Sequence, residues 1–284
     1  MNIYLDTSAF NWLLDDPNSA HLQECVVQKC RLYLSIFTFA ELASESCAER
    51  RIELIRLAKK LSGGFRPAAM PGDLLRRSKD AIINRRSDMD NSMGTEWNGI
   101  WAALNNPDLI DEMALAEIQA WKTNQEKWYC EMFDSARPPI QEALRGLRPG
   151  QIEAICHSFA EFMRLFGSVP AIVGNFFHDI ASKLSSEPIT RAMTGDLIRH
   201  SEHWRFFYGA VGYGLWARTY KLKNYGKKSS PGSIDTQQAI YISICDCFVT
   251  ADSGQYDMLR LVKQFGHKKR IIWKYDRFRD VICD

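Results

Sequence analysis

The sequence predicts an α/β fold in which a central parallel sheet lies between helices and a large all-helical segment interrupts the chain. Short strand patterns alternate with helix patterns at both ends, over residues 1–62 and 232–284. Such alternation favours parallel strands joined by crossover helices. Helix-period segments dominate residues 63–231, where strand-like alternation is scarce. We therefore predict a discontinuous sheet domain with a helical insertion.

The composition is that of a globular protein. The 284 residues are 46% hydrophobic and 25% charged, which supplies ample material for a core in one large or two small domains. The net charge of +2 excludes an overall basic field, so any nucleic-acid site must be a local patch. The eight cysteines lack the dense spacing of a disulfide scaffold, and we find no signal-peptide pattern or membrane span. We expect a reduced, cytoplasmic, soluble protein.

The N-terminal part contains two predicted strands. Residues 2–5 form the first, and a helix follows over residues 9–14. A second helix over residues 21–29 leads into the second strand, residues 32–36. A third helix begins at Thr38 and continues to about residue 61, before Gly63 and Gly64.

The insertion is predicted to be helical throughout. Its helix-period segments cover residues 73–86, 97–104, 109–133, 139–147, 151–166 and 189–222. A loop over residues 223–233, basic and rich in Gly, Ser and Pro, returns the chain to the sheet.

The stretch after this loop predicts a helix over residues 235–245 and a buried strand over residues 247–250. The helix is about 15 Å long and the strand that runs back along it is of similar length. If the two pack antiparallel, Asp252 returns to the level of Asp235, and Asp246 remains at the far end as a loop or capping residue. The last predicted elements are a helix over residues 256–265 and a strand over residues 270–274.

Four acids fall at the carboxyl edge of this predicted sheet, where open α/β sheets place their ligands. Asp6 follows the first strand, Glu41 lies in the first turn after the second, Asp235 starts a helix and Asp252 follows the next strand. Carboxylates this close repel one another unless a cation neutralises them. A ligand set with only oxygen atoms suits Mg²⁺ or Mn²⁺.

Each acid also has a purely structural interpretation. Asp6 can cap the helix that follows it, Glu41 can complete a capping box with Thr38, Asp235 can start another with Gln238, and Asp252 can form a turn. Capping alone gives no reason for the four to converge.

These residues resemble the PIN-domain nucleases. The resemblance rests on Leu5-Asp6-Thr7-Ser8, on Glu41 after a strand, on Asp235 opening an apolar helix and on Phe248-Val249-Thr250-Ala251-Asp252. It covers residues 1–62 and 232–284, and the insertion has no counterpart. It implies a parallel sheet between helices and an acidic pocket that holds Mg²⁺ or Mn²⁺ and cleaves RNA, or DNA in the flap-endonuclease relatives. It further implies Asp6, Glu41, Asp235 and Asp252 as metal-binding catalytic acids, with Thr250 and Thr7 or Ser8 as supporting hydroxyls.

The expected function is therefore that of a metal-dependent endoribonuclease. We expect Asp6 and Asp252 to bind the metal directly, and Glu41 and Asp235 to bind it directly or through water, with either able to accept a proton. Two alternatives stay open: a non-catalytic RNA- or protein-binding module of the same fold, and a structure-specific DNA nuclease.

Basic residues interleaved with aromatic ones precede the returning loop and suit single-stranded nucleic acid. They are Arg218, Lys221, Lys223, Lys227 and Lys228, with Trp216, Tyr220 and Tyr225 among them. A helix with a solvated basic face and buried aromatics explains them equally well. The insertion can also serve as a docking surface for a protein partner. Many small bacterial relatives are toxins paired with an antitoxin, but the greater length of this chain argues against that role.

Other chemical signals are weaker. His200 and His203 are spaced as metal ligands can be, but are more typical of a solvated helix face. Cys245 and Cys247 lack a second cysteine pair at zinc spacing, so we expect buried, inert thiols. The sequence has no phosphate-binding loop of an NTPase. Haloacid-dehalogenase phosphatases carry a second Asp where this chain has Ser8.

Overall fold

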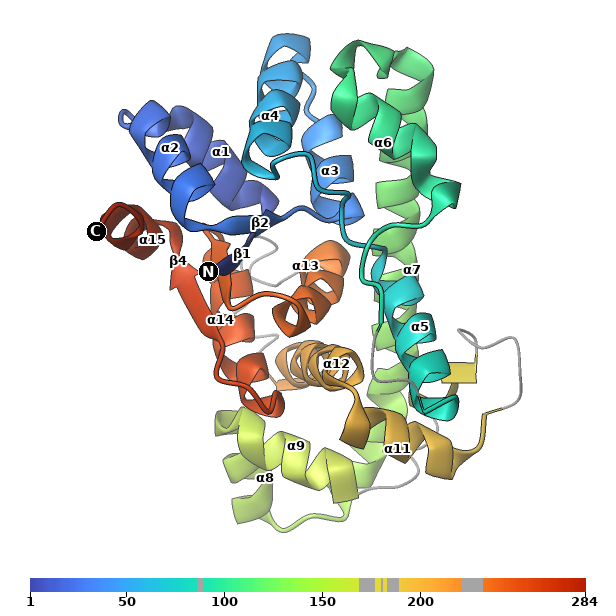
Figure 1. Cartoon of the computed structure of the whole chain (residues 1–284). Coiled ribbons are helices and arrows are strands. Elements are labelled where there is room, and N and C mark those ends of the chain that lie inside the picture. The colour runs from blue at the N-terminus through green and yellow to red at the C-terminus, as the bar shows by residue number, and fades with distance from the viewer. Residues whose placement is uncertain (86–88, 169–176, 180, 183–188, 221–231) are drawn as a thin grey trace.

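A computed structural model describes residues 1–85, 89–168, 177–179, 181–182, 189–220 and 232–284. Its centre is a four-stranded sheet in the order β2-β1-β3-β4, in which every pairing is parallel (Figure 1). The strands are β1 (Asn2–Leu5), β2 (Arg31–Tyr33), β3 (Cys247–Thr250) and β4 (Ile271–Lys274). The predicted α/β class with a parallel sheet is thus confirmed, although most of the described chain is helical.

Four helices accompany the N-terminal strands. They are α1 (Thr7–Asp15), α2 (Ser19–Lys29), α3 (Ile36–Ala43) and α4 (Ala48–Leu61). The second strand ends earlier than predicted, because Ser35 caps α3 by accepting the backbone N–H of Thr38 at 3.0 Å. The single helix predicted from Thr38 to about residue 61 is also wrong: α3 ends at Ala43, and Ser44 bonds back to its last turn.

The segment over residues 63–231 contains helices in every described stretch of more than a few residues, as predicted. They are α5 (Pro71–Ile83), η1 (Thr95–Trp97), α6 (Asn98–Asn105), η2 (Pro107–Leu109), α7 (Glu112–Arg145), α8 (Pro149–His157), α9 (Phe159–Ser168), α11 (Arg191–His200) and α12 (Glu202–Tyr220). The predicted helices over 109–133 and 139–147 are one helix, α7. Conversely, the predictions over 151–166 and 189–222 are each broken at a serine, Ser158 and Ser201, with extended backbone. Serine competes for backbone hydrogen bonds, and the hydroxyl of Ser201 accepts the N–H of Trp204.

The C-terminal segment provides the remaining helices. They are α13 (Ser233–Gln238), η3 (Ala239–Ser243), α14 (Ser253–Val262), η4 (Lys263–Phe265) and α15 (Tyr275–Ile282). The helix predicted over residues 235–245 begins two residues earlier and tightens into a 3₁₀ helix at Ala239. The strand predicted over residues 247–250 has the observed bounds.

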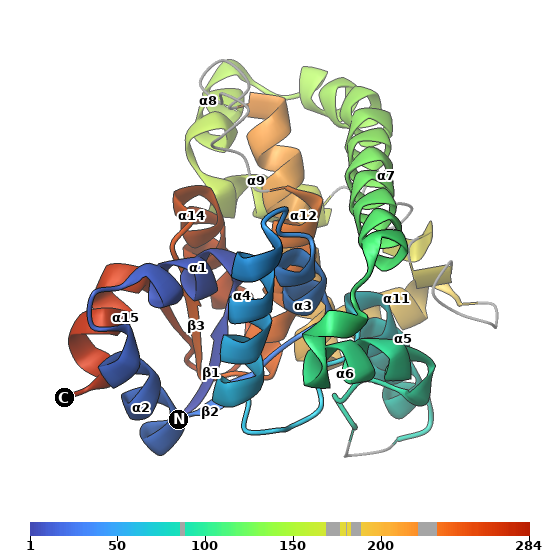
Figure 2. The same ribbon diagram turned by 90° about the horizontal axis from the view of Figure 1, so that it is seen from above.

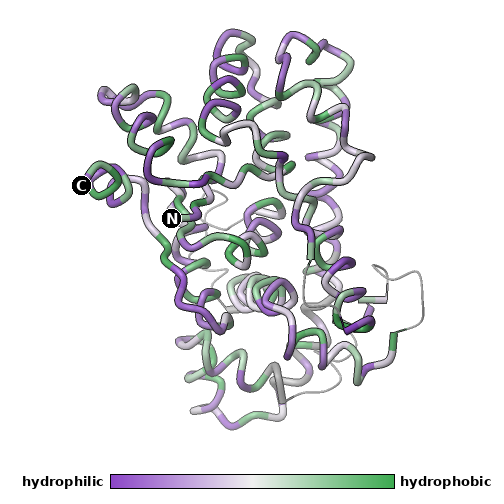
Figure 3. Tube along the Cα trace, viewed as in Figure 1, coloured by the Kyte–Doolittle hydropathy of each residue, from purple (hydrophilic) through white to green (hydrophobic). Residues whose placement is uncertain are grey.

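Alternate residues of each strand enter two different cores, as a pleated strand requires. Ile3, Leu5 and Val249 pack with α1, α2 and α4 on one face of the sheet. Tyr4 and Phe248 pack with η3, α14 and α12 on the other face. The outer helices alternate hydrophobic and hydrophilic positions, as expected of helices with one buried side (Figure 3). The sheet therefore lies between two helical layers.

The second of these cores also contains residues of the helical segment. Trp204 and Phe206 of α12 belong to the same buried cluster as Tyr4 and Phe248. Helix α12 packs on η3 and α14, and through them it belongs to the core on one face of the sheet. The division into a sheet domain and an insertion, residues 63–231, stays a prediction. Residues of both parts pack in this one core, so the core does not separate them.

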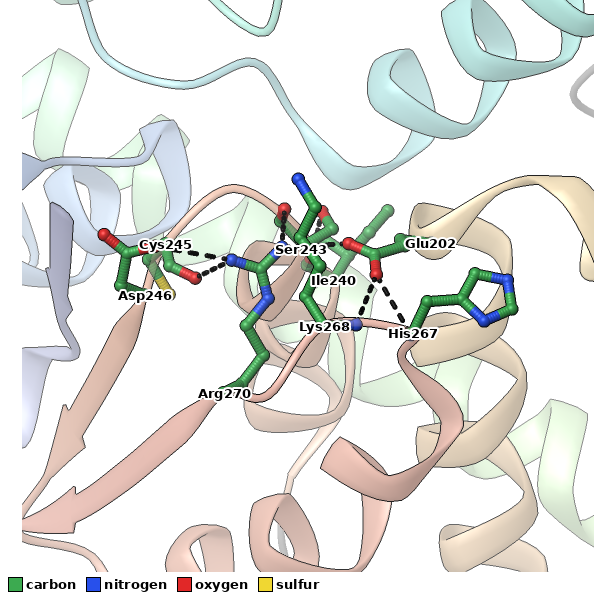
Figure 4. A network of polar contacts seen from close by, with 8 residues as sticks. All are labelled: Glu202, Ile240, Ser243, Cys245, Asp246, His267, Lys268 and Arg270. Carbon is green, nitrogen blue, oxygen red and sulfur yellow. Dashed lines mark hydrogen bonds and ion pairs between the residues drawn. The ribbon is translucent and has the colours of Figure 1, made fainter.

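A buried arginine ties α12 to the amino edge of the sheet (Figure 4). The Arg270 guanidinium donates to the carbonyls of Cys245 at 2.7 Å and Ser243 at 2.9 Å, and pairs with the Glu202 carboxylate of α12 at 2.9 Å. It also lies 3.7 Å from the Asp246 carboxylate. Asp246 accepts the backbone N–H of Asn2 at 2.9 Å, so it is the structural residue that was predicted at this end.

One cysteine pair departs from the expectation of a fully reduced chain. Cys25 of α2 and Cys283, which follows α15, form a disulfide with a Cα–Cα distance of 5.4 Å. Spacing could not reveal it, because the two residues are 258 positions apart and meet only when the C-terminal helix packs on α2. Within the described residues, none of the helices combines the length and apolar character needed to cross a bilayer.

Candidate active site

Asp6 is the most enclosed of the four predicted acids, with 3% of its surface exposed. It follows β1 and caps α1, accepting the Ala9 N–H at 2.7 Å. The hydroxyls of Thr250 and Ser8 also donate to its carboxylate, at 2.6 and 2.8 Å. Burial raises the pKa of Asp6 to about 7, with these hydrogen bonds opposing the rise and the charge of Glu41 adding to it. Asp6 is therefore both a helix cap and a carboxyl group whose ionisation is disfavoured by burial.

Asp252 occupies the equivalent position after β3. Its carboxylate accepts the Gln255 N–H at 2.6 Å and caps α14. The Ser8 hydroxyl oxygen accepts the backbone N–H groups of Ala251 at 2.8 Å and Asp252 at 3.1 Å, and so joins the two strand ends. The structural interpretation of Asp6 as a cap is confirmed, whereas Asp252, expected to form a turn, is the cap of α14. The two aspartates still lie at the same edge of the sheet, because the strands that they follow, β1 and β3, are neighbours.

Glu41 lies in the middle of α3 and not at its start. The capping box that it could form with Thr38 is absent, since Ser35 is the cap. The Glu41 carboxylate instead accepts the Thr7 hydroxyl at 2.6 Å and the Gln238 side-chain amide at 3.0 Å. Burial raises the pKa of Glu41, which the hydrogen bond from Thr7 and the charge of Lys122 partly offset. The helix register thus turns Glu41 toward the loop that contains Asp6 and Thr7.

Asp235 shows that the four acids gather at one place. It lies in the first turn of α13 and accepts the Gly232 N–H at 2.9 Å, so it helps to close that turn. Although part of its surface is exposed, it is densely surrounded by protein, and this burial raises its pKa to about 8. The charges of Glu41, Asp6 and Asp252 contribute to this rise. All three other predicted acids are therefore near enough to act on Asp235.

The predicted hydroxyls bond to these acids: Thr7 to Glu41 and Thr250 to Asp6. Ser8, which the resemblance offered as an alternative to Thr7, does so as well and has the most contacts of the three. The hydroxyl set is therefore larger than the two residues given by the motif.

Two glutamines belong to the site and were not predicted. The Gln255 amide donates to the Gln238 oxygen at 2.9 Å, and Gln238 in turn donates to Glu41. Both glutamines are fully enclosed, with 0% and 1% of their surfaces exposed. Each lies in a polar stretch, residues 235–238 and 252–255, so its residue type alone did not identify a partner.

The long helix α7 contributes two further charged residues (Figures 1 and 2). Lys122 donates to the Ser44 hydroxyl at 2.9 Å, and its charge lowers the pKa of Glu41. Glu126, one turn further along, accepts the Ser233 N–H at 2.9 Å. Helix α7 therefore runs beside the acidic edge, a position that no motif in the sequence indicated.

The donor set of this edge fits a hard divalent cation. It consists of carboxylate and hydroxyl oxygens, which Mg²⁺ and Mn²⁺ prefer. In the described part of the chain, no three of these acids have carboxylate oxygens that all lie within 4.8 Å of one another. The ligand atoms of His21, Cys25 and Cys283 do meet that spacing. Mg²⁺ keeps several waters and is usually bound through one or two carboxylates, so direct contact with all four is not required.

The predicted nucleic-acid patch falls largely outside the described residues. Lys221, Lys223, Lys227 and Lys228 lie in the undescribed segment, and of Arg218 only the backbone, near the end of α12, is described. Trp216 was expected either to stack on bases or to be buried. It is 3% exposed and donates to the Ile155 carbonyl at 2.8 Å, so it belongs to the core.

The weaker cysteine and histidine signals are also resolved. Cys245 and Cys247 are free and buried, as predicted. His203 is not a solvated residue, since its Nε2 is buried, and this burial lowers its pKa to about 4.

A comparison with known proteins finds no matching family model, curated protein or solved structure.

Proposed function

We propose that this protein is a metal-dependent endoribonuclease with a PIN-like fold, whose active site is the acidic edge formed by Asp6, Glu41, Asp235 and Asp252. One observation carries the proposal: burial and the charges of the other three acids together raise the pKa of Asp235 to about 8. A protein gains no stability from crowding buried carboxylates. Such an arrangement is characteristic of functional sites, where perturbed pKa values concentrate.

The position in the fold supports the same conclusion. Asp6 and Asp252 lie just beyond the carboxyl ends of β1 and β3, the two central strands, where open α/β sheets bind their ligands. An all-parallel sheet of four strands between helical layers is compatible with the PIN-like architecture that the motifs resemble. The sheet thus provides a rigid base for side chains that come from distant parts of the sequence.

A bound Mg²⁺ or Mn²⁺ would lower the pKa of a water molecule and screen charge on the phosphate under attack. Asp6 and Asp252 would hold the ion, with Thr250 and Ser8 fixing the orientation of Asp6. Glu41 and Asp235 would bind it through water or accept the proton of the attacking water. A base for that step must lie within hydrogen-bond reach of the water, which the shared edge provides.

Lys122 is the described cation whose charge acts on this group of acids through Glu41. Because it comes from α7, it approaches the edge from outside the sheet. We propose that it contacts a phosphate of the RNA, in the way that basic side chains stabilise charge during phosphoryl transfer. The choice of single-stranded RNA follows from the family resemblance.

The test compares two Asp→Asn variants from opposite edges of the sheet. Purified protein with Mn²⁺ is expected to cut single-stranded RNA internally, and Asp6→Asn should reduce the rate by about 10³-fold or more, because several kcal/mol of charge stabilisation are lost. Asparagine can still cap α1, so the fold should persist. Asp246→Asn, which lies at the other edge, should cleave at the wild-type rate.

Three outcomes would contradict the proposal. Cleavage that survives Asp6→Asn would assign the activity to another site. Failure of the wild-type protein to cut RNA, together with no heat of Mn²⁺ binding in calorimetry, would favour a non-catalytic binding module. Cleavage of flap DNA in preference to RNA would identify the third alternative, a structure-specific DNA nuclease.

A further inference from the structure

A second group of ligand-type side chains lies away from the acidic edge, where α2 meets the end of the chain. His21 Nε2, Cys25 Sγ and Cys283 Sγ all lie within 4.8 Å of one another. His21 and Cys25 are four residues apart on α2, so they lie on the same face of that helix, and Cys25 Sγ is 3.8 Å from His21 Nε2. Cys283 approaches from the segment after α15.

We propose that this group is a binding site for a thiophilic divalent cation of the zinc class when the Cys25–Cys283 disulfide is reduced. Two thiolate sulfurs and an imidazole nitrogen are the ligands that Zn²⁺ prefers, and three protein ligands leave a fourth position for water or another donor. The acidic edge offers only oxygen ligands, so the two sites select different ions.

The structure indicates that the site persists without the sulfur–sulfur bond. Lys29 donates to the carbonyl oxygen of Cys283 at 2.7 Å, which holds that residue beside α2. Phe278 and Ile282 of α15 are buried in the core on the same side of the sheet as α2. These contacts place Cys283 independently of its covalent bond to Cys25.

The change between the two forms is chemically balanced. A dithiol reductant transfers two electrons and two protons to the disulfide and itself becomes a disulfide, leaving two thiols on Cys25 and Cys283. Binding of the cation then displaces both thiol protons to solvent, because the thiolate is the ligand. The neutral imidazole of His21 supplies its Nε2 lone pair. Either form, disulfide or metal, fastens the C-terminal segment to α2.

Cobalt(II) is the probe for this site, since it replaces zinc and reports thiolate ligands by its absorption. The full-length protein is reduced, freed of reductant without air and titrated with Co²⁺. We expect one equivalent to bind with a thiolate-to-cobalt charge-transfer band and with release of two protons, and Zn²⁺ to abolish the band. The oxidised protein should show no band.

Variants assign the ligands. Cys283→Ser should abolish the band, and His21→Ala, at an exposed position that the fold does not need, should weaken Co²⁺ binding at least about tenfold. Cys30→Ser is the matched control, because Cys30 is a free, part-buried thiol at the end of α2 outside the cluster, and it should bind as the wild type does.

The result is independent of the proposed nuclease. Asp6→Asn should leave the cobalt band unchanged, because an all-oxygen site produces no thiolate absorption. The inference is overturned if the reduced wild-type protein gives no charge-transfer band, or if a protein lacking both Cys25 and Cys283 gives the same band. An unchanged affinity in His21→Ala would likewise remove the imidazole from the site and overturn the three-ligand assignment.

Discussion

The two edges of the central sheet differ in the effect of the protein on the pKa values of their acids. At the amino edge, Arg270 is 8% exposed and lies between two acids, Glu202 and Asp246 (Figure 4). Burial opposes ionisation of Glu202, but the hydrogen bond and charge of Arg270 outweigh it and lower the pKa of Glu202 below its usual value. At the carboxyl edge, burial raises the pKa values of Asp6 and Asp235 to about 7 and about 8.

The source of the counter-charge distinguishes the two edges. The amino edge carries its own counter-charge, and each acid there also bonds to backbone N–H groups of a neighbouring element. The carboxyl edge has hydroxyl and amide donors, but the described residues place only Lys122 near its four acids. Hydrogen bonds fix the orientation of these carboxylates without neutralising them. Under the proposed function, a bound divalent cation would supply the missing positive charge.

The largest expected effect is at the amino edge. Arg270→Met leaves Glu202 without its cation and the carbonyls of Ser243 and Cys245 without their donor. Removing one partner of a buried ion pair costs about 3–5 kcal/mol, so we expect the free energy of unfolding to fall by that amount in urea titration. A loss below about 1 kcal/mol would show that the pair contributes little to joining α12 to the sheet. Lys127, in an exposed pair with Glu131, provides the control, since Lys127→Met should change stability by less than about 1 kcal/mol.

The pH dependence of stability should identify the uncompensated edge. Asp6 and Asp235 have folded pKa values of about 7 and about 8, against 3.8 for an ordinary aspartate. Between pH 4 and pH 8 the folded protein therefore holds protons that the unfolded chain has released, and its stability falls as the pH rises. One pKa unit corresponds to about 1.4 kcal/mol, so we expect a loss on the order of a few kcal/mol in EDTA, which Mn²⁺ should reverse by binding the folded state.

The measurement is the unfolding midpoint from pH 4 to pH 8, with EDTA and with Mn²⁺. The same series on Asp6→Asn and Asp235→Asn isolates the two groups from the rest of the protein. The wild-type midpoint also contains the opposite contribution of buried His203, whose pKa is lowered to about 4. A pH dependence that is the same in the wild-type protein and in both variants would therefore contradict the pKa shifts of Asp6 and Asp235.

Substitution at the two edges should change stability in opposite directions. Asp235→Asn removes a repelled carboxylate but keeps an oxygen for the Gly232 N–H, so we expect the metal-free protein at pH 8 to gain about 1–2 kcal/mol, the usual gain when a functional residue is removed. Asp246→Asn removes a charge that Arg270 attracts and should cost up to about 1 kcal/mol. Chemical denaturation of both variants in EDTA measures the contrast. A loss of stability in both variants would mean that Asp235 serves the fold and not an ion.

The smallest effect is expected at Lys122, the cation that α7 brings to the acidic edge. If it contacts one phosphate, Lys122→Met should weaken single-stranded RNA binding and reduce the slope of log K against log salt by about 0.7. Fluorescence anisotropy over a range of salt concentrations measures the slope. Lys127→Met, on the exposed part of the same helix, is the control. An unchanged slope would leave Lys122 as a partner of Ser44 and Glu41 only.

The sequence determined the local elements that carry the acids. The β1 and β3 strands have the predicted bounds because their apolar runs end at acidic or turn-forming residues, and strong local patterns require no knowledge of distant contacts. The parallel order of the sheet followed from the alternation of strands and helices. The sequence failed where neighbouring helices are separated by a single residue, as at Ser201, since helix period continues across such a break.

Only the tertiary structure decided which side chains meet. Lys122, Gln238 and Gln255 reach the acids because α7, α13 and α14 pack beside the sheet. His21 and Cys25 meet Cys283 because α15 packs on α2. Sequence patterns report the burial and period of one element at a time. The distances between side chains on different elements are set by packing, and packing placed a buried arginine between the acids of one edge and brought four acids together at the other.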